Sequence, residues 1–200
     1  MSQIKTPDVF NFAFKGRRDY VQGTDMYMSF RDHVALPTKS SIETLSFNGF
    51  LRGDARLIEL DDPRGSKLPC VAYISGPDGM RVLGLEQIGP VSKDTSEYLE
   101  EEIVECGVFS ESGITLDRET GYDTIEEIIA LIKKWSNVNR PVDGSWVFAR
   151  IDALDGSPPF PAHRTDELHI EFSAAAGRKF TRFAVSSGES KAMVTFGVNT

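Results

Sequence analysis

The sequence predicts an α+β fold: a mainly antiparallel β-sheet packed on one principal helix, residues 124–135, and on a second, shorter helix at 95–106. Three observations lead to this fold class. Apolar residues recur at helical spacing in only these two segments. Most of the remaining chain alternates with period two between Gly, Pro and Asp turns. The chain also holds 13 Phe, a residue that favours strands.

The principal helix is marked by its first residues, its apolar face and its charges. Asp123 and Glu126 have the spacing of a capping box, in which each side chain accepts from the other's backbone. Glu126 and Glu127 fall in the first turn and Lys133 and Lys134 in the expected last turn, which suits the helix dipole. The apolar residues that share one face are Ile125, Ile128, Ile129, Ile132 and Trp135.

The shorter helix is predicted from a second capping pattern, Asp94 followed by Glu97. Three residues then share a face, and Gly107 is a plausible stop; the three are Leu99, Ile103 and Cys106. The acidic run 100–102 is expected to lie largely in solvent, in preference to the alternative of a paired-carboxylate site.

Strands are predicted wherever residues alternate between turns. In the first part of the chain, a strand is predicted at 26–30, where Met26, Met28 and Phe30 alternate with the residues between them. A second predicted strand, 43–52, turns at Gly53 and Asp54 into a third, 55–60, and a hairpin is predicted from 70–75 and 80–85. After the principal helix, 145–198 is expected to form four antiparallel strands, the last two joined at 187–189. Alternation places Leu168, Ile170 and Phe172 inward.

Composition narrows the classes of partner. With 200 residues the chain is expected to be a single domain, 1–200. The net charge of −8 and a pI near 5.0 argue against nucleic acid and against anionic membranes. The N-terminus has no apolar signal region and no apolar run is long enough to span a membrane, so a cytoplasmic location is expected. A homo-oligomer is left open.

No cofactor or metal is expected. Phosphate-binding, dinucleotide and hydrolase motifs are missing from the sequence. His33, His163 and His169 do not have the spacing of a closed metal site. Two cysteines cannot form a disulfide framework, and Cys70, within an apolar run, is expected to be a small buried hydrophobe.

Two pseudo-repeat halves, 9–90 and 120–200, are suggested by a similar order of elements. In each half a Thr-Asp pair, 24–25 or 165–166, opens a strand, and a later strand turns through Gly and an acidic residue into another. The halves would share one core. Repeated strand hairpins with an apolar-faced helix are similar to the layout of hotdog proteins, in which a sheet wraps a helix. That resemblance implies the handling of acyl thioesters, as by a thioesterase or a dehydratase.

The first candidate site is the proline-stiffened segment 158–166. His163 is the candidate general base and Asp166 the carboxylate that orients its ring, so these two are the candidate catalytic residues. Arg164 is a candidate ligand-binding residue, since its guanidinium can hold a carboxylate or a phosphate. The alternative is a rigid surface loop in which Asp166 caps a turn.

The second candidate site is the matching segment 15–25. Arg17 and Arg18 supply positive charge, Tyr20 a hydrogen bond and Asp25 a carboxylate, and all four are candidate ligand-binding residues. The alternative is a solvated loop with glycines at its turns. Nearby Phe and Met residues are expected to be core rather than the wall of an apolar ligand cavity; they are Phe10, Phe12, Phe14, Met26, Met28 and Phe30.

These observations favour a small-molecule binding protein or enzyme, of unknown specificity, for an apolar or acyl-type ligand. The alternative is a non-catalytic assembly or protein-interaction domain, and whether the chain is an enzyme stays open. The position of His163 separates the two hypotheses. A histidine in a closed pocket beside a carboxylate favours the first, whereas exposure on a loop favours the second.

Overall fold

The computed structural model describes residues 9–16, 18–64, 66–89 and 95–199, and the chain divides into two compact units, Met1–Tyr98 and Leu99–Thr200. Each unit contains an antiparallel sheet with a helix against one face. The predicted α+β class, mainly antiparallel and hotdog-like, is therefore confirmed. That the chain is one domain, with two pseudo-repeat halves that share a core, stays a prediction.

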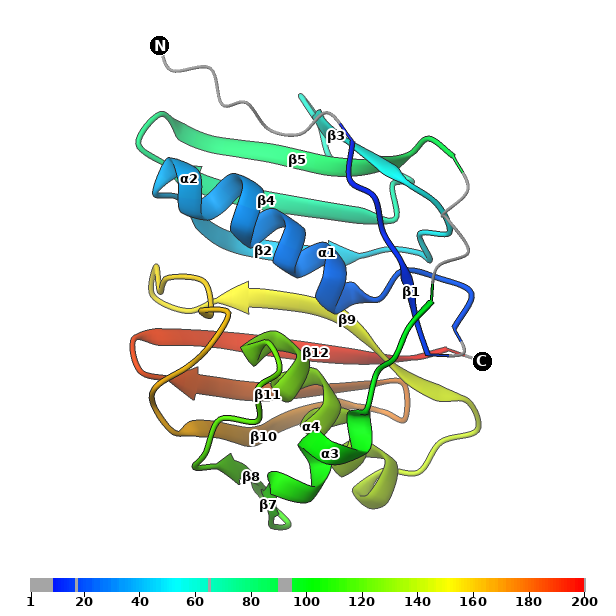
Figure 1. Cartoon of the computed structure of the whole chain (residues 1–200), viewed down its shortest axis with the longest axis vertical. Helices are drawn as coiled ribbons and strands as arrows, with labels where there is room; N and C mark the ends of the chain where they lie inside the picture. The colour runs from blue at the N-terminus through cyan, green and yellow to red at the C-terminus, as the bar shows by residue number, and fades with distance from the viewer. Residues whose placement is uncertain (1–8, 17, 65, 90–94, 200) are drawn as a thin grey trace. The chain divides into compact units, whose positions relative to one another are not determined.

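Unit 1 is built around the sheet order β3-β5-β4-β2, with helix α1 lying over the sheet (Figure 1). A two-stranded parallel pair, β1 with β6, lies outside this sheet. The elements in chain order are β1 (Phe14–Lys15), α1 (Gly23–Phe30), the π-helical turn η1 (Arg31–Ala35), α2 (Leu36–Thr38), β2 (Ser41–Phe47), β3 (Ala55–Glu59), β4 (Cys70–Gly76), β5 (Gly79–Gln87) and β6 (Thr95–Ser96).

The predicted strand at 26–30 is wrong, because this segment lies within helix α1. Met26, Tyr27, Phe30 and Val34 are all buried, and their spacing is that of one helical face. The alternation of Met26, Met28 and Phe30 covers only five residues, which is too short to distinguish period 2 from period 3.6. Burial against the unit 1 sheet decides between them, since the helix places a continuous apolar stripe on that face.

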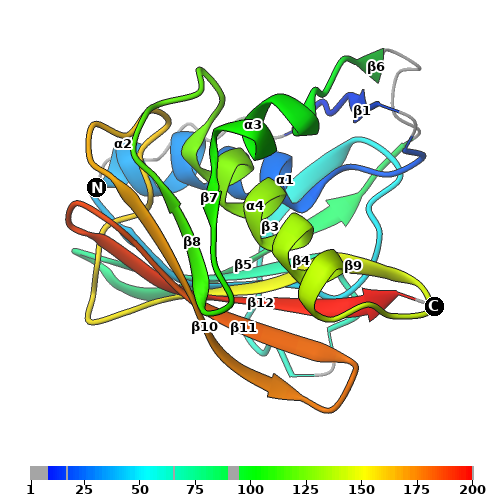
Figure 2. The same cartoon turned by 90° about the horizontal axis from the view of Figure 1, so that it is seen from below.

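Unit 2 has the sheet order β9-β12-β11-β10-β8-β7, and helix α4 lies on one face of this sheet (Figure 2). Trp135 of α4 stacks on Phe172 with ring centroids 5.0 Å apart and meets Phe183 edge-on at 5.3 Å. The elements are α3 (Glu100–Cys106), β7 (Val108–Phe109), β8 (Gly113–Leu116), α4 (Thr124–Asn139), β9 (Ser145–Ala153), β10 (Leu168–Ala176), β11 (Phe180–Ser187) and β12 (Ser190–Asn199).

The principal helix is confirmed and is longer than predicted. Asp123 is its N-cap, and both hydrogen bonds of the capping box with Glu126 are present. All five predicted face residues, from Ile125 to Trp135, are buried. Because α4 continues to Asn139, Lys133 and Lys134 lie inside the helix and not in its last turn. Lys133 pairs instead with Glu100 of α3 at 2.9 Å.

The shorter helix begins later than the predicted residue 95. Thr95 and Ser96 form strand β6, and α3 runs from Glu100 with Leu99 as its N-cap. Asp94, the predicted cap, lies outside the described residues. Pairing with β1 takes the backbone of 95–96 into an extended conformation, which a helix start there would exclude. Of the predicted helix face, Ile103 is buried, but Leu99 is exposed and Cys106 is half-buried. Glu101 and Glu102 are exposed, as expected.

The four predicted strands of 145–198 are confirmed, with Leu168 and Ile170 buried and Phe172 half-buried. The hairpin of β4 and β5 through 76–79 and that of β11 and β12 through 187–189 are also present. Cys70 is buried, as predicted. Within the part of the chain that the structure describes, no helix has the length and apolarity needed to cross a membrane.

Each unit has a helix followed by four antiparallel strands, but the third and fourth of these strands lie in the opposite order in the two sheets. In unit 2 the fourth strand after the helix, β12, lies beside the first, β9; in unit 1 the third strand, β4, lies beside the first, β2. The segment 26–30 that was matched with 167–172 is helical, so that correspondence between the halves is wrong.

Candidate functional site

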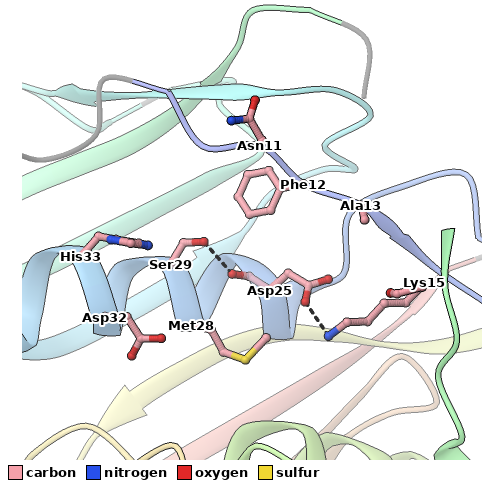
Figure 3. A pocket seen from close by; sticks show the side chains of 10 residues that line it. Asn11, Phe12, Ala13, Lys15, Asp25, Met28, Ser29, Asp32 and His33 are labelled. Atoms are coloured by element: carbon pink, nitrogen blue, oxygen red, sulfur yellow. Dashed lines mark hydrogen bonds and ion pairs between the residues drawn. The ribbon is translucent and has the colours of Figure 1, made fainter. Parts of the chain in front are cut away.

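A cleft of about 320 Å³ lies within unit 1, between the extended segment 11–15 and the helix that begins at Gly23 (Figure 3). Its volume falls in the range of small-molecule sites. Most of its lining side chains are charged or can form hydrogen bonds, and three are apolar. The lining residues are Asn11, Phe12, Ala13, Lys15, Asp25, Met28, Ser29, Asp32, His33 and Ser96.

The wall formed by 11–15 is fixed at both ends by backbone hydrogen bonds. Phe10 and Ala55 of β3 exchange two of them, at 2.7 and 3.1 Å. At the other end Lys15 pairs with Ser96, and the amide of Gly16 donates to the Ser96 carbonyl at 2.9 Å. Gly16 has φ +62°, a conformation that side chains disfavour, so glycine suits the turn directly after Lys15. Backbone pairing therefore anchors this wall of the cleft at both ends.

One end of the cleft holds an ion pair that is largely shielded from solvent. Lys15 Nζ lies 2.5 Å from Asp25 Oδ1, and the two side chains are 15% and 13% exposed. Asp25 sits in the first turn of α1, where the helix dipole favours a carboxylate. Charge is costly to bury, so a shielded pair opening into a cleft is a candidate for ligand recognition.

Further positive charge gathers at the same end. The Lys15 ammonium and the Arg18 guanidinium both lie 5.7 Å from the centre of the Tyr98 ring. Such cation–π contacts hold cations in place without neutralising them. Because Lys15 is also paired with Asp25, this part of the chain holds two cations beside one carboxylate.

The helix supplies the opposite wall through one face of α1 and η1. Asp25, Met28, Ser29 and Asp32 follow the i, i+3, i+4, i+7 spacing of a single helical face. The Ser29 hydroxyl donates to the Asp25 backbone carbonyl at 2.9 Å. Figure 3 shows Lys15 and Asp25 toward one end of the helix and Asp32 and His33 toward the other.

A buried arginine orients the carboxylate at the second end. Arg31 donates through Nε to Asp32 Oδ1 at 2.6 Å and through a terminal nitrogen to Oδ2 at 3.1 Å. The Arg31 side chain is 2% exposed and that of Asp32 44% exposed. The pair thus places its cation inside and its carboxylate at the surface of the cleft. The imidazole of His33 contacts Phe10, with ring centroids 5.5 Å apart.

The predicted residues of segment 15–25 are partly brought together. Asp25 lines the cleft, and Arg18 shares the Tyr98 ring with Lys15. Tyr20 lies against Phe50, with ring centroids 4.4 Å apart. Arg17 lies outside the described residues. Of the apolar residues expected to be core, Phe12 and Met28 line the cleft, although Phe12 is itself buried.

In unit 2 the predicted residues of 158–166 turn toward different partners. His163 is on the surface, its side chain 63% exposed, with Nδ1 2.8 Å from Glu119. Arg164 is buried: it donates through Nε to Glu127 at 2.7 Å and through another nitrogen to the Asp166 carbonyl at 2.7 Å. It also donates to the Arg118 carbonyl.

The Asp166 side chain is exposed and lies beside Gly188. The buried Arg164 stabilises the loop from inside, because its guanidinium donates to Glu127 and to the backbone carbonyls of Arg118 and Asp166. The exposure of His163 matches a surface loop and not a base in a closed pocket. A catalytic role for His163 and Asp166 stays a prediction.

Sequence reasoning did not single out most residues of the cleft, namely Asn11, Lys15, Ser29, Asp32, His33 and Ser96. The sequence did contain a pattern that indicates the cleft residues on the helix. Once 23–35 is treated as a helix, its polar positions 25, 29 and 32 align on one face opposite the apolar stripe. Ser96 carried no signal, since only the pairing of β1 with β6 brings it beside Lys15. Among the described residues, no group of three or more His, Cys, Asp or Glu could hold a metal ion.

Comparison with known proteins found no matching family model and no matching curated protein. Similar solved structures include a pyran synthase domain from module nine of the sorangicin pathway, 12% identical, with a TM-score of 0.46 over 96% of this chain and 92% of that one. Another is the bifunctional dehydratase-cyclase domain in ambruticin biosynthesis, 11% identical, with a TM-score of 0.43 over 90% and 83%. At these scores and identities the likeness shows neither a shared activity nor a shared site.

Proposed function

We propose that this chain binds a small acyl-type ligand in the cleft of unit 1. The observation that carries the proposal is the shielded Lys15–Asp25 pair at one end of a cleft of about 320 Å³. The Lys15 ammonium would donate to a carboxylate or carbonyl oxygen of the ligand. Phe12 and Met28 would contact its aliphatic part.

Asp25 supports this role by positioning the cation. A lysine side chain is flexible, and the 2.5 Å contact with Asp25 restricts where its ammonium can lie. A ligand anion that approaches Lys15 also benefits from the nearby Arg18 guanidinium. The cleft is thus organised before the ligand arrives, which lowers the entropic cost of binding.

The test uses hexanoate as the probe and hexanol as its uncharged match. Titration of ¹⁵N-labelled protein should shift the amides of Gly16 and Ser96 with hexanoate and much less with hexanol. Lys15→Met should weaken hexanoate binding by about tenfold or more, as expected for the loss of a charge-assisted hydrogen bond. Lys67→Met makes the same change at an exposed position outside the cleft lining and should leave affinity unchanged. Equal responses to hexanoate and hexanol would overturn the proposal without any variant.

A second candidate function, non-catalytic assembly, is favoured by the exposed apolar residues of unit 2. β7 is the last strand of its sheet, and its Val108 and Phe109 are 65% and 38% exposed. Strand edges of this kind pair with other chains unless charge blocks them. We propose that this edge joins two copies of the chain. Sedimentation should then show a dimer that Val108→Lys converts to monomer; a monomeric wild-type chain at high concentration would contradict this.

A further inference from the structure

We infer that Asn48 is a site of spontaneous modification, at which the side-chain amide reacts with the backbone nitrogen of Gly49 and is converted to aspartate and isoaspartate. The two residues lie in the loop 48–54, between β2 and β3 of unit 1. The reaction needs no ligand, so it takes place whether or not the cleft binds one.

The chemistry consumes one water and releases one ammonia. The Gly49 nitrogen attacks Cγ of Asn48, the new C–N bond closes a succinimide ring, and the side-chain nitrogen leaves as ammonia with the former Gly49 amide proton. Water then opens the ring. Cleavage of the bond between the nitrogen and Cγ gives aspartate in an ordinary backbone. Cleavage of the bond between the nitrogen and the backbone carbonyl carbon gives isoaspartate, whose main chain runs through Cβ and Cγ and is longer by one carbon.

Both reacting groups are accessible and lightly held. Asn48 and Gly49 are exposed. The Asn48 side chain donates to the Leu68 carbonyl at 3.4 Å, which is longer than an ordinary hydrogen bond. Among the described residues, the Gly49 amide has no hydrogen-bond partner. Because Gly49 has no side chain, its nitrogen can approach Asn48 Cγ closely.

The other asparagines are protected by structure or by sequence. Asn137 and Asn139 lie in α4, where the backbone amides that follow them are engaged in helical hydrogen bonds. Asn11 and Asn199 are followed by Phe and Thr, whose side chains hinder closure of the ring. Asn48 is therefore the asparagine expected to react first.

The loop that carries Asn48 also holds the segment leading into helix α1. The ring of Phe50 packs on that of Tyr20, with centroids 4.4 Å apart. The Leu51 carbonyl accepts from the Val21 amide at 2.8 Å, and Leu51 has no exposed surface. Because Gln22, the N-cap of α1, follows directly, a shift of this loop reaches the start of the helix.

Isoaspartate at 48 would insert its extra carbon between two anchored points. On one side, the backbone amide of Asn48 donates to the Pro69 carbonyl at 2.8 Å; on the other side is the buried Leu51. The longer chain displaces Phe50 or Leu51, and the hydrogen bond from Val21 is expected to weaken.

The first experiment incubates the wild-type chain in neutral buffer at physiological temperature and follows each asparagine by peptide mapping with mass spectrometry. Asn48 should be converted faster than every other asparagine, to both products. Gly49→Ala places a methyl group in open space and should slow the conversion at least about tenfold, equivalent to about 1.4 kcal/mol of activation free energy, because the methyl hinders attack. Gly89→Ala makes the same change at another open glycine and should leave the rate unchanged. Conversion of Asn48 no faster than of the others, or equal rates in wild type and Gly49→Ala, would overturn the inference.

The second experiment tests the effect on the start of α1. The isoaspartate form, separated by chromatography, should lose hydrogen-exchange protection at the Val21 amide. The Asn48→Asp variant carries the same new charge on an ordinary backbone and should keep the wild-type protection. Equal protection of Val21 in these two forms would overturn the predicted displacement of the loop.

Discussion

Replacement of Arg164 by Met should destabilise unit 2, because it breaks a buried ion pair. Glu127 has no exposed side-chain surface, and Arg164 is 2% exposed. Without the guanidinium, the donors left to the Glu127 carboxylate among the described residues are the amide and hydroxyl of Thr120, at 2.9 and 2.7 Å. Removal of one partner of a buried pair costs about 3–5 kcal/mol. We expect a loss in this range from the free energy of unfolding.

Urea unfolding measured by tryptophan fluorescence reports on this change, since both tryptophans, Trp135 and Trp146, lie in unit 2. The double variant Glu127→Leu with Arg164→Met removes both charges and should be more stable than Arg164→Met alone, because no uncompensated carboxylate remains. Arg178→Met, in an exposed turn, is the matched control and should change stability by less than about 0.5 kcal/mol. A loss below about 1 kcal/mol for Arg164→Met would refute the reasoning.

Three further outcomes are expected. Ile128→Ala removes a fully buried side chain of α4 and should cost about 2–5 kcal/mol of unfolding free energy in the same urea assay; a loss under about 0.5 kcal/mol would show that this face is not core. Burial raises the pKa of the Cys70 thiol well above its ordinary value, so a thiol reagent should label Cys106 in the folded protein and Cys70 only on unfolding. The hydrogen bond and charge of Arg81 hold the pKa of Glu59 below its ordinary value of 4.5. This pair therefore stabilises the fold above pH 4.5, and its contribution disappears as the pH falls through the lowered pKa. Arg81→Met should reduce the loss of stability on acidification, and identical pH profiles of unfolding free energy for the variant and the wild type would contradict this.

Arg164 and Lys15 show how far side-chain chemistry can be read from the sequence. The sequence indicated that Arg164 could hold an anion, and it does hold one, but the anion is the internal carboxylate of Glu127. Those residues are 37 positions apart. No local pattern links them, since their contact exists only once α4 and the 158–166 loop are folded. Lys15 was passed over because a lone lysine in a loop carries no signal without its partner, Asp25.

Local physics determined the parts of the fold that have several agreeing signals. The capping box at Asp123, the apolar stripe of α4 and the four strands of 145–198 depend on spacing between near neighbours, so the sequence alone predicts them. The segment 26–30 needed the tertiary structure, because five alternating residues suit either period until a sheet covers one side. The exchanged inner strands of unit 1 and the cleft beneath 11–15 were likewise decided by tertiary structure alone. Both arise from hydrogen bonds between segments that are distant in sequence, such as Phe10 with Ala55 and Lys15 with Ser96, and backbone pairing of this kind leaves no mark on side-chain periodicity.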